Sequence, residues 1–200
     1  MPSDPLILAF DTSAAYCAAA LLRGDQIIAA TSEAMTRGQA ERLMPLLQEM
    51  LAGAGAGWRD LAALGVGIGP GNFTGIRIAV SAARGLALGL DVPGVGVSGC
   101  EARAYLCAKD ICPAIPAPRD MVYLCRPGAT PQLLPLQEAQ TSATMQGQTL
   151  NSEYSPQGLA EAIAHITASR WATTTQPPAP LYVRPVDAAP SRHVPPVMLD

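Results

Sequence analysis

Charged side chains are scarce in this chain of 200 residues: 14% of the residues are charged and 4% aromatic, whereas 49% are apolar. A typical soluble domain carries about 25% charged residues. The deficit predicts that part of the apolar surface is covered by a partner, or alternatively that the chain is merely rich in alanine. The length suits one domain or two small lobes that share a core.

Basic residues are few as well, because Lys and Arg number 13 against 16 Asp and Glu, which leaves a net charge of −3. A pI near 5.3 argues against a protein that binds nucleic acid by itself, so another subunit is expected to supply most contacts to any RNA. Arg77, Arg84 or a glycine interrupts each apolar run before the roughly 18 residues that a membrane span needs. No membrane-spanning helix is therefore expected.

Cysteine spacing gives no sign of a metal or disulfide framework. The five cysteines are an odd number and include no CxxC pair, which favours buried, reduced thiols in a cytoplasmic protein. The segment MPSDPLILAF has no basic region before its short apolar run, so no signal peptide is expected. His165 and His193 are expected to be surface or packing residues, since no carboxylate or cysteine cluster joins them at ligand spacing. No metal or cofactor is therefore predicted.

Hydrophobic patterning predicts an α/β protein. A buried strand over Leu6–Phe10, followed by a hairpin around Gly24-Asp25, predicts three consecutive antiparallel strands. Helices and strands then alternate, which implies parallel pairing through crossovers. The expected helices lie within residues 37–57, 58–64, 72–90 and 98–109, and the expected strands within 64–69 and 92–97.

The pattern weakens after Lys109. Two strands are expected over 121–127 and 130–136, and a helix over 155–171 begins with Ser155 as its N-cap. From Thr173 onward the chain is rich in proline and is expected to be extended. The predicted division is a lobe over 1–108 and a smaller lobe, with the proline-rich tail, over 109–200.

A glycine-rich turn separates the strand at 64–69 from the helix at 72–90. Glycines there would let a phosphate approach the backbone at a helix N-terminus, but GxxxxGK[ST] is absent, and a tight structural turn is an equal alternative. Asp11-Thr12-Ser13 follows the first strand and would either hold a metal-bridged phosphate or tighten the hairpin. The residues of this vestigial nucleotide-like site are Asp11, Thr12, Ser13, Gly69, Gly71 and Thr74.

The helices within 37–57 and 72–90 carry more apolar surface than one sheet needs. The second is unusually slim, because alanine and glycine dominate it, and small residues let helices approach closely. One face of each is expected to pack on its own sheet and another on a partner, although core packing on both sides is the alternative. The residues expected at the partner interface are Arg42, Leu43, Leu46, Leu47, Met50, Arg77, Val80, Ala83, Arg84 and Ala87.

Several segments resemble the bacterial TsaB (YeaZ) family. They are LILAFDTSAAYCAAALL, RGQAERLMPLLQEML, GVGIGPGNFTGIRIAVSAARGLALGL and PGVGVSGCEA, and the late segment PLYVRPVDA resembles the family's Tyr-Leu-Arg-Pro-x-Asp. The likeness is dense over Leu6–Ala104 and patchy over Lys109–Thr175. It implies an actin-like ATPase (ASKHA) fold of two RNase H-like lobes, of which the second is abridged here.

The resemblance also implies a role. Such proteins are non-catalytic subunits of the machinery that makes threonylcarbamoyladenosine beside the tRNA anticodon, with the transferase TsaD and the ATPase TsaE as partners. Where TsaD has its Asn-His-x-x-x-His metal motif, this chain has Gly99 and Arg103, which cannot hold a cation. The TsaD interface is implied on the first two helices, as is a homodimer when TsaD is missing. Ala83→Arg is therefore expected to abolish association without unfolding the chain.

Some positions depart from the family pattern. Pro116 and Met121 stand where acidic residues are common, and Gln39 replaces a common histidine. These departures place any nucleotide or TsaE contact of the second lobe in question. Two alternatives to the scaffold role remain, the first from the residues and the second from an older association of the family. One is an ATP-binding phosphotransferase or ATPase of the same fold that uses Asp11 and the Gly69 turn, and the other is a metallopeptidase-like protein.

Overall fold

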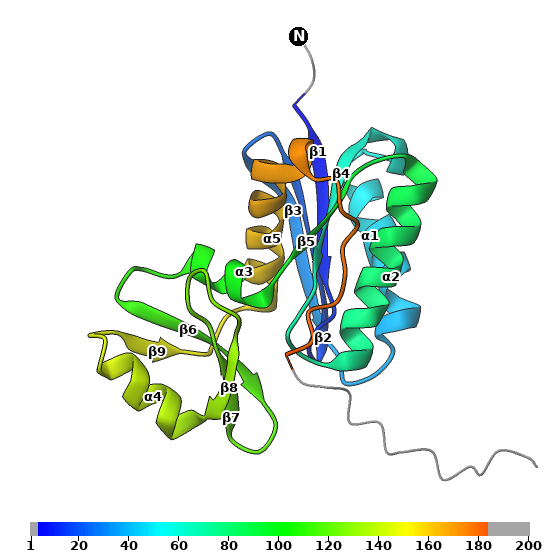
Figure 1. Ribbon diagram of the computed structural model, residues 1–200. Helices are drawn as coiled ribbons and strands as arrows, with labels where there is room; N and C mark the ends of the chain where they lie inside the picture. The colour runs from blue at the N-terminus through cyan, green and yellow to red at the C-terminus, as the bar shows by residue number, and fades with distance from the viewer. Residues whose placement is uncertain (1–3, 184–200) are drawn as a thin grey trace, which may run out of the picture.

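The computed structural model describes residues 4–183, which form two sheets joined through a shared helical layer (Figure 1). The elements of the first half are β1 (Leu6–Asp11), β2 (Tyr16–Arg23), β3 (Gln26–Ala34), α1 (Gln39–Gly53), β4 (Leu61–Gly67), α2 (Phe73–Leu90), β5 (Gly94–Val97) and α3 (Gly99–Leu106). Those of the second half are β6 (Ile111–Ala117), β7 (Met121–Leu124), β8 (Gln132–Pro135), α4 (Leu136–Thr144), β9 (Thr149–Asn151) and α5 (Pro156–Arg170).

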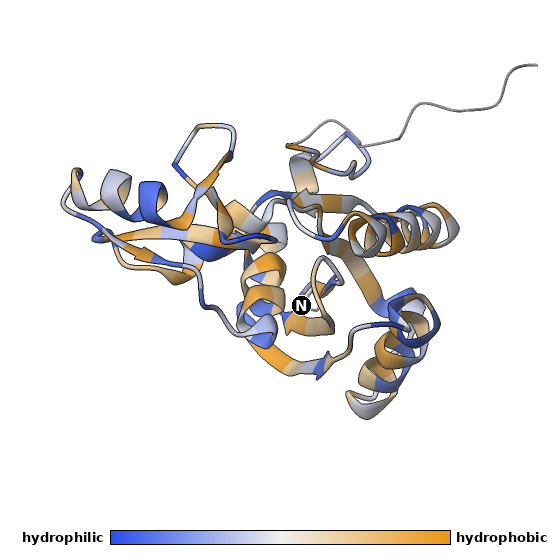
Figure 2. Ribbon diagram, turned by 90° about the horizontal axis from the view of Figure 1, so that it is seen from below, coloured by the Kyte–Doolittle hydropathy of each residue, from blue (hydrophilic) through white to orange (hydrophobic). Residues whose placement is uncertain are grey.

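The first sheet has the strand order β3-β2-β1-β4-β5. β1, β2 and β3 pair antiparallel, as the hairpin pattern predicts, and β1, β4 and β5 pair parallel. The apolar run of β1 is buried throughout because helices cover both faces of the sheet. Figure 2 shows the consequence, with the strands of this sheet coloured mostly hydrophobic and the helices in mixed colours.

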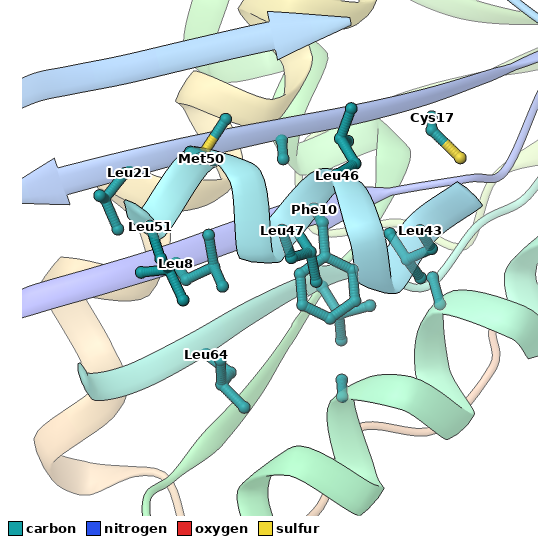
Figure 3. Packing of buried hydrophobic residues seen from close by; sticks show 14 of the residues in the cluster. Leu8, Phe10, Cys17, Leu21, Leu43, Leu46, Leu47, Met50, Leu51 and Leu64 are labelled. Carbon is teal, nitrogen blue, oxygen red and sulfur yellow. The ribbon is translucent and has the colours of Figure 1, made fainter. Parts of the chain in front are cut away.

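Alternate residues of β1 divide between two cores. Leu6, Leu8 and Phe10 face α1 and α2, and Ile7 and Ala9 face α3 and α5. Figure 3 shows the first core, in which leucines of α1 surround Phe10. Helices therefore sandwich the first sheet, and the sandwich holds most of the large buried side chains of the described residues.

The segment after α1 differs from the prediction of a short helix over 58–64. Only Trp58–Asp60 forms a single 3-10 turn, and β4 already begins at Leu61. Leu61 pairs with Leu6 and Ala63 with Ile7. Pairing with a neighbouring strand buries Leu61, Ala63 and Leu64, which a surface helix would have left half exposed.

The second sheet has the strand order β8-β7-β6-β9 and one helix of its own, α4. The sequence analysis missed β6, because Pro113 and Pro116 argue against a strand. Both prolines are tolerated because each part of β6 pairs with only one neighbouring strand. Ile111–Pro113 pair with β9, whereas Ala114–Ala117 pair with β7. The core between this sheet and α4 combines small residues with Val122 and Leu124; the small residues are Cys112, Ala114, Ala139 and Ala143.

Two segments of the second half return to the first sheet. α5 packs against β1 and β2, so the first lobe includes residues beyond the expected boundary at residue 108. The extended segment 174–182, here called the strap, then runs along β5, where Pro178 lies against Gly94 and Gly96. The Leu181 amide donates to the Ile68 carbonyl (2.8 Å) and holds the strap in place.

Candidate functional site

The carboxylate of Asp11 lies at the carboxyl end of β1, and the protein itself occupies its oxygens. Oδ1 accepts a hydrogen bond from the Ser13 amide (3.0 Å), and Oδ2 accepts from Ser13 Oγ (2.9 Å) and Tyr16 Oη (2.6 Å). Asp11 is 4% exposed. Burial, together with the Asp11 charge, raises the pKa of Tyr16 far above its usual range, so the phenol remains a donor. The arrangement tightens the turn between β1 and β2.

The glycine-rich turn packs directly on that same segment. A side chain at Gly71 would collide with the Ser13 carbonyl, and one at Gly75 would collide with the Thr12 carbonyl. Thr12 Oγ1 in turn donates to the Gly75 carbonyl (2.7 Å). The glycines at 71 and 75 therefore allow close contact between two backbone segments.

Hydrogen bonds within the chain already use backbone amides at the N-terminus of α2 that could otherwise bind a phosphate. Asn72 caps it by accepting from the Gly75 amide (2.8 Å), and the Asn72 amide donates to the Ser13 carbonyl (2.7 Å). Thr74 is exposed in the first turn, and the Gly69 carbonyl accepts from the Gly99 amide (2.8 Å). The structure thus joins Asp11–Ser13 to the turn around Gly71 in contacts that suit a structural turn, whereas Gly69 contacts Gly99 and Thr74 faces solvent.

A cleft of about 850 Å³ separates this turn from the second sheet, and Arg103 faces it. The guanidinium donates to the Gly99 carbonyl (3.0 Å) and lies 5.4 Å from the ring of Tyr154. Burial lowers the pKa of Arg103, although the nearby Tyr16 and Asp11 oppose the shift. Within residues 4–183 no group of three His, Cys, Asp or Glu side chains is placed to hold a metal ion. A cation does not fit here, because Arg103 repels it and Asp11 already accepts three hydrogen bonds.

Most of the residues predicted at the partner interface belong to the core instead. Their exposed fractions lie between 0% and 8%, and they are Leu43, Leu46, Leu47, Met50, Val80 and Ala83. The apolar stripe of each helix faces its own sheet, where it covers Leu8 and Phe10. Ala83→Arg is therefore no longer expected to leave the fold intact, because the new charge would be buried without a partner.

The outward side of α1 and α2 carries a different set of residues. Met44 is 39% exposed and Leu88 is 86% exposed. A side chain at Gly85 or Gly89 would meet nothing within 4 Å. Of the remaining predicted interface residues, Arg77 and Arg84 are exposed, and Ala87 is half-buried. We call Arg84, Gly85, Leu88 and Gly89 of α2 the outer helix face.

Arg42 joins α1 to β3. Its guanidinium donates to both carboxylate oxygens of Glu33 (2.7 and 2.8 Å) and to both of Glu49 (2.6 and 2.8 Å). These hydrogen bonds hold the pKa of both carboxyl groups below the usual range. The predicted interface residue Arg42 is thus already paired within the chain.

The helix α2 has a length and composition that a membrane span could also have, although Arg77 and Arg84 interrupt its apolar residues. Its 18 residues have a mean hydropathy of 1.3, and 28% of them are buried in the structure. The buried residues include Ile76, Ala79 and Val80, which face the first sheet. Core helices of globular proteins can have the same length and mean hydropathy, so these two properties alone do not indicate a membrane span.

One contact of the strap, and the packing of Arg77 within α2, could not be read from the sequence. Arg77 Nε donates to Tyr182 Oη (2.8 Å), and its guanidinium lies 3.8 Å from the ring centre of Phe73. Tyr182 belongs to the late segment PLYVRPVDA, of which residues 184–188 lie outside the described part of the chain, as does His193. His165 stacks on Tyr105 with ring centres 5.7 Å apart, in keeping with a packing role.

The prediction that all cysteines are reduced is wrong. Cys100 and Cys125 form a disulfide with Cα atoms 5.3 Å apart, whereas Cys17, Cys107 and Cys112 are free. The sequence gives no signal for this pair, because 25 residues and two secondary-structure elements separate its members. Burial raises the pKa of the Cys17 thiol to about 11.

The comparisons with known proteins agree on a family. The family model described as "TsaD: tRNA N6-adenosine threonylcarbamoyltransferase" matches residues 28–183. The "tRNA threonylcarbamoyladenosine biosynthesis protein TsaB" of Haemophilus influenzae is 37% identical over 58% of this chain and 51% of its own length. The TsaB of Escherichia coli is 42% identical over 46% of this chain and 39% of its own length.

A solved structure extends the likeness to the whole fold. The "YeaZ from Pseudomonas aeruginosa" has a TM-score of 0.72 at 25% identity, over 90% of this chain and 100% of that one. The curated TsaB relatives are matched over only about half of their length. The expected RNase H-like, ASKHA-type α/β fold is confirmed. The chain belongs to the family that the matching model describes and, within it, to the TsaB (YeaZ) group.

Proposed function

We propose that this chain is a non-catalytic scaffold in the biosynthesis of threonylcarbamoyladenosine, where it binds a TsaD-type catalytic subunit. The product is the modified adenosine next to the anticodon of tRNAs that read codons beginning with A. The names of its TsaB relatives support the pathway. The observation that carries the scaffold role is the outer helix face, where Leu88 is 86% exposed beside two uncovered glycines.

The outer helix face has the shape that helix-on-helix docking needs. Gly85 and Gly89 are one helical turn apart on α2, so the backbone of a partner helix can approach closely between them. Leu88 would fill a hole in that partner. This face extends the interface implied by the family resemblance, with exposed residues in place of the buried ones.

The site at the end of β1 supports a role without catalysis. An ATPase or phosphotransferase of this fold would need Asp11 free to bind a metal-bound phosphate, but Ser13 and Tyr16 hydrogen-bond to both its oxygens. A metallopeptidase would need a cation beside Arg103. The residues therefore favour the scaffold over both alternatives.

Further partners follow from the same proposal. A TsaE-type ATPase would join the complex, tRNA would be contacted only indirectly, and the chain would form a homodimer when TsaD is absent. The net charge of −3 agrees with indirect contact to RNA. Such a role places the chain in the cytoplasm.

Leu88→Asp tests the proposal. We expect it to weaken binding to the TsaD-type protein of the same organism at least tenfold, about 1.4 kcal/mol, because a carboxylate would be buried at the helix contact. Met145→Asp is the matched control, since Met145 is 83% exposed and lies at the end of α4 in the second lobe. Binding would be measured by calorimetry or co-purification of the tagged proteins.

Equal binding of the Leu88→Asp variant and the unaltered chain would contradict the proposed interface. ATP turnover by the pure chain, lost on Asp11→Asn, would favour the ATPase instead.

A further inference from the structure

A second cavity, of about 1000 Å³, gathers most of the cysteines. It lies between α3 and the second sheet, and it is separate from the cleft that Arg103 faces. Four of the five cysteines line it: Cys100, Cys107, Cys112 and Cys125. They come from α3, from the segment that follows it, from β6 and from the end of β7.

The disulfide in this cavity joins the two lobes. Cys100 lies in the first turn of α3, which packs with α5 on the first lobe, and Cys125 directly follows β7 of the second sheet. Cys125 is 2% exposed, whereas Cys100 is half-buried. Both cysteines line the cavity, and we expect a reagent to attack Cys100 because it is the more exposed of the two.

The charges around the cavity favour an anionic reagent. Glu101 is neutralised, because its carboxylate pairs with Arg170 (2.8 Å). Lys109 and Arg126 also line the cavity, and neither forms an ion pair within residues 4–183. The Nε of Arg126 is buried without a hydrogen-bond partner, although its other end donates to Ser142 (2.7 Å). Two uncompensated cations thus remain beside the disulfide.

We propose that Cys100–Cys125 is a thiol–disulfide exchange site whose reductant is an anionic low-molecular-mass thiol of the glutathione class. The thiolate attacks Cys100 Sγ and forms a mixed disulfide, while the bond to Cys125 breaks and the Cys125 sulfur takes a proton. A second thiolate attacks the mixed disulfide, releases the oxidised small disulfide and leaves Cys100 as a thiol. Two small thiols are oxidised, and the protein disulfide is reduced to two thiols.

The other thiols of the cavity supply internal controls. Cys112 is 3% exposed, and burial raises its pKa, so it remains protonated and unreactive. Cys107 is half-buried and free, but it forms no part of the bond. The inference is independent of the proposed function, because it depends only on the bond, the cavity and its charges.

The experiment follows the number of alkylated thiols in the folded, full-length chain. After oxidation by dissolved air and then denaturation without reductant, iodoacetamide should modify three cysteines. After native incubation with a small thiol, removal of that thiol and denaturation, it should modify all five. Rates with mercaptoacetate and with cysteamine would be divided by the rates of the same thiols on a neutral model disulfide. We expect the anionic thiol to be roughly tenfold faster, and the advantage to shrink with salt.

Variants assign the effect to residues. Cys107→Ser should exchange at the rate of the unaltered chain, whereas Cys100→Ser should leave four thiols that need no reduction. Lys109→Gln, an exposed substitution, should reduce the preference for mercaptoacetate severalfold. Five alkylated thiols after oxidation, a bond that resists thiols until the protein unfolds, or equal normalised rates for the two thiols would each overturn the proposal. Since the first measurement uses the unaltered chain, a variant that fails to fold does not remove the test.

Discussion

The two sheets of this protein are built from similar elements but stabilised differently. The first is covered on both faces by helices, and the cores on its two faces hold fully buried leucines, isoleucines and Phe10 of β1. The second has one helix of its own and a core of alanines, one cysteine and a few larger residues, and a disulfide ties it to α3. Because burial of large apolar side chains is the main stabilising contribution, the first lobe should carry the fold and the second should depend on its attachment.

A buried charge introduced into each lobe should give the largest difference between the lobes in how much of the chain unfolds. Ala83 and Ala143 are 0% and 1% exposed, on α2 and on α4 respectively. We expect Ala83→Arg to unfold the whole chain, because the guanidinium has no partner among the surrounding leucines. Ala143→Arg should unfold only the second sheet and leave the first lobe native. Urea unfolding followed by circular dichroism, with hydrogen exchange of each lobe, would distinguish the outcomes, and equal loss of both lobes in both variants would refute the comparison.

Cavity-forming substitutions should show the same contrast on a smaller scale. Leu47→Ala in the first core is expected to cost about 3 kcal/mol of global stability, and Leu124→Ala in the second about 2 kcal/mol, mostly as local opening. The second core is thinner and can collapse around the missing atoms. The measurements are the urea midpoint and the exchange rates of β6 and β7 amides. A larger global loss from Leu124→Ala would show that the two lobes unfold as one unit.

The smallest effect concerns the ion pair of Glu101 with Arg170. Burial alone would raise the pKa of Glu101, but hydrogen bonds from Arg170 and Ser98 lower it overall. The pKa of Glu101 is therefore lower in the folded chain than in the unfolded chain. The stability that its ion pair contributes is present above roughly pH 4.3, the ordinary pKa of Glu, and is lost as the pH falls through the folded pKa. Arg170→Gln should remove about 0.5 kcal/mol at neutral pH, since both side chains are partly exposed and screened.

The check on this last prediction is the pH dependence itself. Unfolding free energies of the Arg170→Gln variant and the unaltered chain should differ at pH 7 and converge toward pH 2. Lys109→Gln controls for the change of net charge, because it also removes one positive charge and the exposed Lys109 forms no ion pair within residues 4–183. A constant difference across the pH range would mean that Arg170 acts through its contact with the Gly96 carbonyl instead.

Local patterns in the sequence determined the first sheet and the family. The buried run of β1, the hairpin turn and the alternation that follows leave few topologies, because parallel strands need crossovers and the chain is short. The second sheet was harder to predict, since Pro113 and Pro116 argue against a strand at β6. These prolines are tolerated only because each part of β6 pairs with a single neighbouring strand. The family segments lie mostly in the first half, where the local patterns are strong.

Only the tertiary structure decided which side of α1 and α2 faces outward and which cysteines meet. An apolar stripe with helical spacing shows that a helix has something to bury, but not whether its own sheet or a partner covers the stripe. Leu43 and Ala83 are covered by the chain itself, and Leu88 is left uncovered. Cys100 and Cys125 likewise become neighbours only when the second sheet docks on α3, because their contact depends on folding of the segment between them.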